Sequence, residues 1–286
     1  MTLSLNRVLL SAAVLVFSAA VIASGTGAFF SDTETSTGNT FSAGDIDLQI
    51  DNESYAIDFN VDPNDEEADG SLIFSEATSW EMADLVAGTH KFFDFSDIKP
   101  GDYGEDTISI HVGSNDAWMC AAARLTDDSD QSCTEPEMGD DGTCQTPGLG
   151  MGELDSEIQF AFWNDDGDNV YEPGSEGEDD ENIFLSGPLS ELNSAGQLAL
   201  ATPAGGAFGD DPVPGGETIY IGKIWCMGTL VATDLEQDGV NNVRSPLTGT
   251  GFTCDGTLVD NASQTDQVQG DLQFYAVQAR NNPNFS

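Results

Sequence analysis

One loop-like stretch, "FWNDDGDNVYEPGSEGEDDEN", begins at Phe162 and places side-chain oxygens two residues apart. Alternating oxygen donors on a tight turn suit a hard divalent ion such as Ca2+, which takes roughly six to eight oxygen ligands. The candidate ligands are Asn164, Asp166, Asp168, Val170 through its carbonyl oxygen, and Glu172 or Glu176 as the closing carboxylate. The pattern therefore predicts a calcium site, with a solvated acidic turn as the alternative interpretation.

This stretch departs from the EF-hand loop. Asn169 stands where the glycine of the sharp turn would be, and no acid occupies the twelfth position. Asn tolerates the left-handed backbone conformation that such a turn requires. The sequence thus indicates an oxygen-rich cation site of irregular spacing rather than an EF-hand.

Two further acidic runs are candidates of lower specificity. "DLEQDGVNN" offers Asp234, Glu236 and Asp238, followed by a glycine, but no closing acid. A cluster at Asp127, Asp128 and Asp130 is interpreted as a solvated loop.

The chain lacks the usual sequence motifs of catalysis. It contains no H-E-x-x-H, no G-x-S-x-G and no P-loop, and its two histidines, His90 and His111, are far apart in sequence. Carboxylate pairs can be chosen at will from 51 acidic residues, so a pair carries no information about glycoside hydrolysis. We expect a protein that is not an enzyme.

The charge balance excludes polyanionic partners. Seven basic residues stand against 51 acidic ones, a formal net charge of -44. A field of this sign repels nucleic acid and anionic lipid. Hydrophobic residues nevertheless make up 39% of the chain and include 16 Phe and 4 Trp, enough to build a packed core. Salt, bound divalent cations or the spreading of charge over loops must therefore relieve the self-repulsion.

The N-terminus has the organisation of a secretory signal peptide. Arg7 precedes an apolar run from Val8 to Ala23, and small residues ending at Ala28 follow. The alternative is a retained membrane anchor, because the run is close to the minimum spanning length. We expect cleavage after residues 1–28, contact with the membrane only during export, and a mature protein at the cell surface or in the extracellular matrix, with a charge of -45 because the leader contains Arg7 and no acid.

Five cysteines in a chain with a secretion signal favour disulfides. Cys133 and Cys144 bracket the loop "CTEPEMGDDGTC", Cys226 and Cys254 bracket a longer segment, and these are the preferred pairs. Cys120 is left over in the apolar context "AWMCAAARL" and is expected to be a buried, unreactive thiol. Without a C-x-x-C motif, zinc is disfavoured.

Short strand-like runs separated by Gly, Pro, Asp and Asn predict an all-β sandwich with long acidic insertions. Some alternate apolar and polar residues, as at Ile108, Ile110 and Val112. The best helical candidate is "PLSELNSAGQLAL". The strand-like runs are "DIDLQI", "SYAIDFNV", "DTISIHV", "WMCAAARL", "EIQFAFW", "ETIYIGKIWC" and "DLQFYAVQA". The expected organisation is a leader (1–28), an extended Ser/Thr-rich segment (29–40) able to pair with a sheet edge, and one sandwich domain (41–286).

Three blocks in this order resemble the TasA/camelysin family. They are "GAFFSDTETSTGNTFSAGDIDLQI" from Gly27, "DIKPGDYGEDTISIHV" from Asp97, and "GDLQFYAVQARNN" from Gly270. The resemblance implies a jelly-roll sandwich, processed by a dedicated signal peptidase, that forms biofilm-matrix fibres or archaeal pili. In such fibres the N-terminal strand of one subunit enters the sheet of the next, so the partner is another copy of the chain, bound head to tail.

This resemblance also suggests which residues anchor the donated strand. They are Phe29, Phe30, Phe41, Ile46 and Leu48. Two alternatives remain: a camelysin-type secreted metalloprotease, although no zinc-ligand motif is present, and a monomeric calcium-binding surface or adhesion module. The strong acidity, the insertions and the cysteine content depart from the family pattern.

Overall fold

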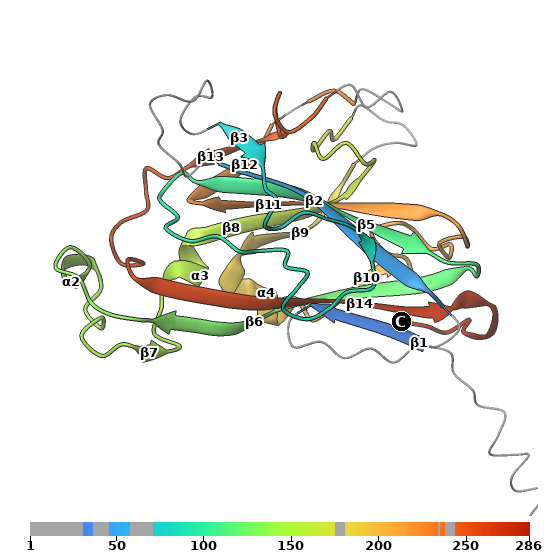
Figure 1. Ribbon diagram of the computed structural model, residues 1–286, viewed down its shortest axis with the longest axis horizontal. Coiled ribbons are helices and arrows are strands. Elements are labelled where there is room, and N and C mark those ends of the chain that lie inside the picture. The colour runs from blue at the N-terminus through green and yellow to red at the C-terminus, as the bar shows by residue number, and fades with distance from the viewer. Residues whose placement is uncertain (1–30, 37–45, 58–70, 175–180, 234, 238–243) are drawn as a thin grey trace, which may run out of the picture. The chain divides into compact units, whose positions relative to one another are not determined.

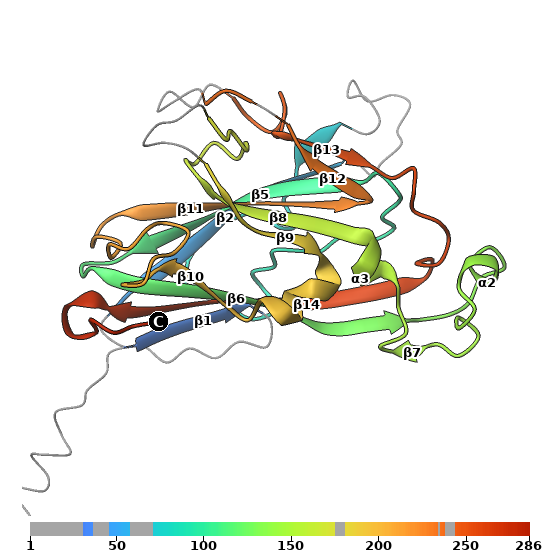
Figure 2. The same ribbon diagram turned by 180° about the vertical axis from the view of Figure 1, so that it is seen from behind.

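Two antiparallel sheets dominate the computed structural model, which describes residues 31–36, 46–57, 71–174, 181–233, 235–237 and 244–286 (Figures 1 and 2). The larger sheet has the order β3 (Leu72–Phe74), β2 (Leu48–Ile57), β5 (Tyr103–Val112), β11 (Thr218–Met227), β8 (Ile158–Asp165) and β9 (Ile183–Pro188), with β4 (Trp80–Ala83) also on β2. The smaller sheet has the order β1 (Ser31–Ser36), β14 (Asp266–Gln278), β6 (Ala117–Asp130) and β10 (Gln197–Ala201), with β7 (Gly148–Leu149) on β6.

The remaining elements are short. β12 (Thr229–Ala232) and β13 (Phe252–Asp255) form a separate hairpin. The helical turns are α2 (Glu137–Asp140), α3 (Leu154–Glu157), η1 (Leu189–Glu191), α4 (Leu192–Ala195) and η2 (Ala279–Asn281). Among the described residues, no helix combines the length and the apolar character that a membrane crossing needs.

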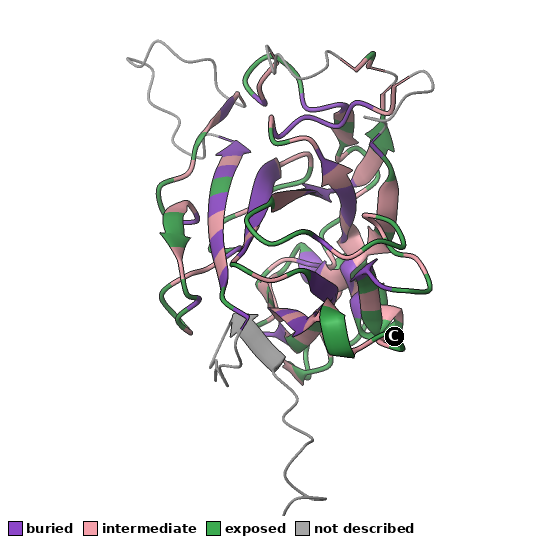
Figure 3. Ribbon diagram, turned by 90° about the vertical axis from the view of Figure 1, so that its right-hand side faces the viewer, coloured by how far each residue is buried: buried purple, intermediate pink, exposed green. Residues whose placement is uncertain are grey.

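The core lies between the two sheets because each strand turns alternate side chains inward. On β5, Ile108 and Ile110 are completely buried, and on β14, Phe274 and Ala276 are at most 1% exposed. Figure 3 shows buried residues concentrated in the strands, where they form bands with intermediate ones, and exposed residues concentrated in the loops. The all-β sandwich predicted from the sequence is confirmed.

The chain passes repeatedly from one sheet to the other, as in jelly-roll sandwiches. It crosses from β5 to β6, from β9 to β10, from β10 to β11, and through the β12–β13 hairpin to β14. The strand-like runs near residues 45–61 form a single strand, β2, as far as they are described. This topology brings segments far apart in sequence onto the same face.

A second, smaller core covers the outer face of the larger sheet. It contains Ala161, Trp163, Tyr171 and Ile224, with Phe252 of β13 packed against it. Gly222 of β11 makes room for this core, because a Cβ atom there would lie 2.0 Å from the Trp163 indole. The outer face of β8 is thereby covered where this strand runs into the acidic loop.

Two sequence predictions need correction. The helix predicted from Pro188 to Leu200 is limited to η1 and α4, and it ends at Gly196, whose φ of 67° is left-handed. The residues after Gly196 form β10, because their apolar side chains are needed in the sheet. The cluster at Asp127–Asp130 is not a solvated loop but the end of β6, paired with β14.

The cysteines behave as predicted. Disulfides join Cys133 to Cys144 and Cys226 to Cys254. Cys120 is free and buried on β6, and burial raises the pKa of its thiol. An unionised buried thiol is a poor nucleophile.

Candidate functional site

Four carboxylates converge where β8 ends and β9 is about to begin. Asp165, Asp166, Asp168 and Glu181 each present an oxygen, and these oxygens all lie within 4.8 Å of one another. Asp165 and Glu181 are almost fully buried. The site is therefore a cluster of acidic side chains held partly inside the fold rather than spread over a loop.

Asp165 is the fixed centre of this group. Its Oδ1 accepts the indole N–H of Trp163 at 3.2 Å, and its Oδ2 accepts the hydroxyl of Thr107 at 2.8 Å. The backbone N–H groups of Gly167 and Asn169 also point at Oδ2, at 3.2 and 3.3 Å. The loop after β8 thus folds around the carboxylate of Asp165.

Glu181 closes the loop from the other side. Its Oε1 accepts the N–H of Asp166 at 3.1 Å and its Oε2 the N–H of Glu172 at 2.6 Å. Asp168 accepts the N–H of Val170 at 2.9 Å through Oδ1, whereas its buried Oδ2 has no hydrogen-bond partner. An unpartnered oxygen is thus available for a cation.

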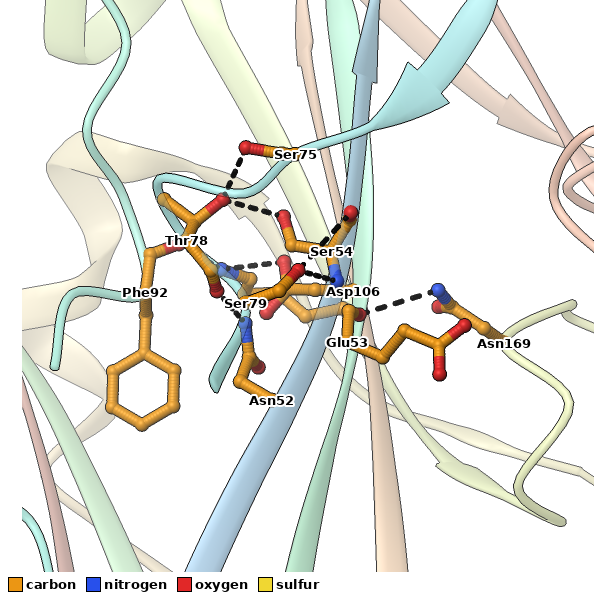
Figure 4. Close-up of polar contacts among 10 residues, drawn as sticks. Asn52, Glu53, Ser54, Ser75, Thr78, Ser79, Phe92, Asp106 and Asn169 are labelled. Atoms are coloured by element: carbon orange, nitrogen blue, oxygen red, sulfur yellow. Dashed lines mark hydrogen bonds and ion pairs between the residues drawn. The ribbon is translucent and has the colours of Figure 1, made fainter. Parts of the chain in front are cut away.

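The loop has the left-handed turn that the sequence indicated. Asn169 has a φ of 64°, and its side-chain amide reaches the backbone carbonyl of Glu53 on β2 at 3.5 Å (Figure 4). Figure 4 also shows the hydrogen bonds that hold Asn52 and Ser54 of β2 to Thr78, of which the Asn52 bond to the Thr78 carbonyl is 2.7 Å. The acidic loop is therefore attached to a strand more than a hundred residues away in sequence.

Crowding and burial oppose ionisation throughout the group. Burial, followed by the neighbouring carboxylates, raises the pKa of Asp168 to about 7 and of Glu181 to about 10. Burial likewise raises the pKa of Asp165 to about 6, against the effect of its hydrogen bond from Thr107. Glu105 of β5 is fully buried nearby, and its pKa is raised well above normal by burial and by the charges of Asp165 and other acids.

The structure brings together a different set of ligands from the set that sequence spacing predicted. Asp166 and Asp168 belong to the group, and Asp165 and Glu181 join them. Asn164 points to the other face of β8, because neighbouring residues of a strand alternate, and its Oδ1 accepts the N–H of Asn182. The group thus begins at Asp165, one residue after the predicted first ligand, and the alternation of Trp163 and Asp165 on β8 was a usable signal for this.

Other predicted ligands are not among the four carboxylates. Glu172 is buried and pairs with Arg244, which also donates to the carbonyl of Glu236. Val170 is fully buried. Glu176, Asp234 and Asp238 lie outside the described residues, so only Glu236 of the second predicted site is placed.

This donor set fits a hard divalent cation. All four side chains offer oxygen, which is the ligand atom that Ca2+ prefers. Asp168 contributes a buried oxygen without a partner, and Arg244 pairs with Glu172, which is not one of the four. Bound Ca2+ would supply positive charge to the four carboxylates.

The histidines have other roles in the fold. His90 stacks on Trp80 with ring centroids 5.3 Å apart, and its Nδ1 accepts the N–H of Val86. His111 lies between Asp51 at 2.5 Å and Thr218 at 2.8 Å. In the part of the chain that the structure describes, neither histidine belongs to a group of potential metal ligands.

The N-terminal strand forms the edge of the smaller sheet. β1 pairs antiparallel with β14, from Ser31 opposite Val277 to Ser36 opposite Leu272. Ile46 and Leu48, two predicted donor anchors, are instead buried in the chain's own core on the side of the larger sheet. The other three predicted anchors, Phe29, Phe30 and Phe41, lie outside the described residues.

Comparison with known proteins supports the family resemblance. Residues 5–69 match the family described as camelysin metallo-endopeptidase. This match contains the first of the three resembling blocks, whereas the blocks from Asp97 and Gly270 lie beyond it. No curated protein matches the chain.

Proposed function

We propose that this protein is an exported, non-enzymatic structural subunit that assembles head to tail into cell-surface or matrix fibres. The observation that carries the proposal is the position of β1 at the edge of the smaller sheet, where β14 is its one partner strand among the described residues. An edge strand held by backbone hydrogen bonds can be exchanged for the same strand of another copy. Signal-like residues 1–28 and the camelysin match support export.

The donated segment in this proposal is shorter than the resemblance suggested. Ile46 and Leu48 are part of the subunit's own core, so they stay with β2 when β1 moves. The segment that exchanges is Ser31–Ser36 with the residues before it. Residues 37–45 then connect the donated strand to its own sandwich.

Strand donation of this kind produces open filaments. The donor lies on one subunit and the acceptor edge, residues 272–277 of β14, on the next, so the two contact surfaces differ. A heterologous contact that does not close into a ring continues indefinitely. The cation group at Asp165 stabilises the subunit in this proposal, and the signal peptidase acts only before assembly.

Mixing two variants that each carry one added cysteine tests the exchange directly. Thr35 lies opposite Gln273 in the β1–β14 register. Thr35→Cys and Gln273→Cys proteins, mixed under assembly conditions and oxidised, are expected to form a cross-linked heterodimer. The matched control replaces Gln269, four residues along the same strand, and should cross-link weakly.

The outcomes separate the candidate functions. Cross-linking between copies together with filaments in negative stain supports the proposal. A third variant carries both Thr35→Cys and Gln273→Cys. If only this variant cross-links, within one chain, and the protein stays monomeric in every salt tested, the proposal is contradicted and the monomeric calcium-binding module is favoured. Zinc-dependent cleavage of casein by the purified protein would instead support the metalloprotease.

A further inference from the structure

A second group of acids lies at the opposite end of β14 from the β1 contact, and the proposed function does not use it. Asp130, at the end of β6, is directly opposite Asp266, at the start of β14. Glu137 of α2 completes the group, and one oxygen of each residue lies within 4.8 Å of the others. Like charges directly opposite each other destabilise a strand pair.

Each residue of this group has at least one buried carboxylate oxygen without a hydrogen-bond partner. Asp130 is 2% exposed, and neither of its oxygens has a hydrogen-bond partner. Glu137 is fully buried and accepts the N–H of Thr134 at 2.9 Å through Oε2, which leaves Oε1 without a partner. A buried carboxylate oxygen without a partner is costly, so each calls for a ligand.

Asp266 follows the same pattern. Its Oδ2 accepts the N–H groups of Glu153 at 2.7 Å and Leu154 at 3.1 Å, and its Oδ1 has no partner. The hydrogen-bonded oxygens of Glu137 and Asp266 fix these side chains, and the oxygens without a partner remain available to a common ligand. This is the arrangement expected of side chains positioned to coordinate an ion.

No cation of the protein neutralises this group in the described residues. None of the ion pairs there involves Asp130, Glu137 or Asp266. Further acids surround it instead: Asp141 lies within 4.8 Å of Glu137 and has a buried, unpartnered Oδ2. Burial, then the charges of Asp141, Asp266 and others, raises the pKa of Glu153 to about 7.

We propose that Asp130, Glu137 and Asp266 form a second binding site for a divalent cation of the calcium type, with Asp141 as an additional ligand. The donors are all oxygen, because the nearby Cys144 sulfur is committed to its disulfide with Cys133. The ion joins the end of β6, the start of β14 and the disulfide-closed loop that contains α2. It also replaces the repulsion between Asp130 and Asp266 with attraction to a common ion.

Calcium stoichiometry tests this site in the full mature protein. Calcium-depleted protein is titrated with CaCl2 by calorimetry at constant ionic strength. The wild-type protein should bind one equivalent of Ca2+ more than the double variant that carries Asp130→Asn and Glu137→Gln. The control, Glu135→Gln with Glu76→Gln, removes two exposed acids and should bind as wild type does.

Thermal unfolding gives a second signature. Without calcium the Asp130→Asn, Glu137→Gln variant should be at least as stable as wild type, because buried repulsion has been removed. With millimolar Ca2+ the order should reverse, since only wild type gains the ion. Equal calcium-induced shifts in wild type and variant would overturn the proposal.

The test does not depend on that variant folding. Asp166→Asn with Asp168→Asn disables the group at the end of β8 and leaves Asp130, Glu137 and Asp266 intact. This protein should still bind calcium, and a further Asp266→Asn replacement should remove that binding. If the Asp166→Asn, Asp168→Asn protein folds but binds no Ca2+ at millimolar concentration, the second site does not exist. Filament formation is scored separately, so its failure does not affect this result.

Discussion

Nζ of Lys223 lies 2.8 Å from Oδ1 of Asp106, and both side chains are at most 2% exposed. The ammonium group also donates to the carbonyl of Phe92 at 3.0 Å and lies 3.5 Å from the centroid of the Phe93 ring. In a chain with seven basic residues, one is thus buried on β11, a strand of the larger sheet. A buried ion pair contributes little net stability, but loss of one partner leaves an uncompensated buried charge.

Lys223→Met should therefore destabilise the protein by about 3–5 kcal/mol. Adding Asp106→Asn should recover much of the loss, because no buried charge then remains. The exposed pair of Lys91 and Asp94, also 2.8 Å apart, is the control, and Lys91→Met should cost less than about 1 kcal/mol. Urea unfolding measures all three, and equal losses for Lys223→Met and Lys91→Met would contradict the prediction.

Gly222→Ala should destabilise the outer core. The new Cβ would lie within the Trp163 indole, whose N–H hydrogen bond holds Asp165, so we expect a loss of about 1–3 kcal/mol and weaker calcium binding. Gly139→Ala is the control, because a Cβ there meets no atom within 4 Å. Urea unfolding and calcium titration measure the two effects. If the Gly222→Ala protein is destabilised but its calcium affinity is unchanged, the Trp163 hydrogen bond to Asp165 does not contribute to calcium binding.

The effect of pH on stability should change sign with calcium. Burial and charge crowding raise the pKa of Asp165 to about 6 and of Asp168 to about 7, from an ordinary value of 3.8. A raised folded-state pKa contributes stability that is complete below about pH 4 and is lost as pH rises through 6 to 7. Calcium-depleted protein should therefore lose thermal stability between pH 5 and pH 8.

Saturating calcium should produce the opposite trend over the same range, because protons compete with the ion for the carboxylates. Melting temperatures at matched ionic strength, with and without CaCl2, measure both trends. Parallel pH profiles in the two conditions would show that these acids do not bind calcium.

Deletion of residues 31–36 from the mature protein should abolish filaments and leave a folded monomer. β1 contributes one edge strand, whereas the core between the sheets is formed by the later strands. Circular dichroism tests the fold and negative-stain microscopy the filaments. Filaments indistinguishable from those of the intact chain would exclude strand donation through β1.

Filament growth should also increase with ionic strength. Mature subunits with a charge near -45 repel one another, and the screening length falls to about 3 Å at 1 M salt. Light scattering across a NaCl series should show faster growth, and CaCl2 should act at lower ionic strength. Growth that is fastest at low salt would contradict this electrostatic account.

Local features of the sequence were sufficient for much of the fold. The alternation at Ile108, Ile110 and Val112 places a strand with one buried face, because the strand period is two residues. The spacing of Cys133 and Cys144 identifies a short loop that a disulfide can close. Likewise, the extended segment 29–40 was predicted to be able to pair with a sheet edge, and its residues Ser31–Ser36 pair with β14.

The tertiary structure decided which acids meet. Glu181 joins Asp165 only because the loop between them returns to β9, and Asp130 meets Asp266 only through a strand register that links residues 136 positions apart. Such registers depend on the packing of both sheets at once, whereas spacing along the sequence indicates only which residues can meet within one turn or loop. In a chain with 51 acids, local patterns could therefore identify where carboxylates are dense, and only the fold selected those that lie together.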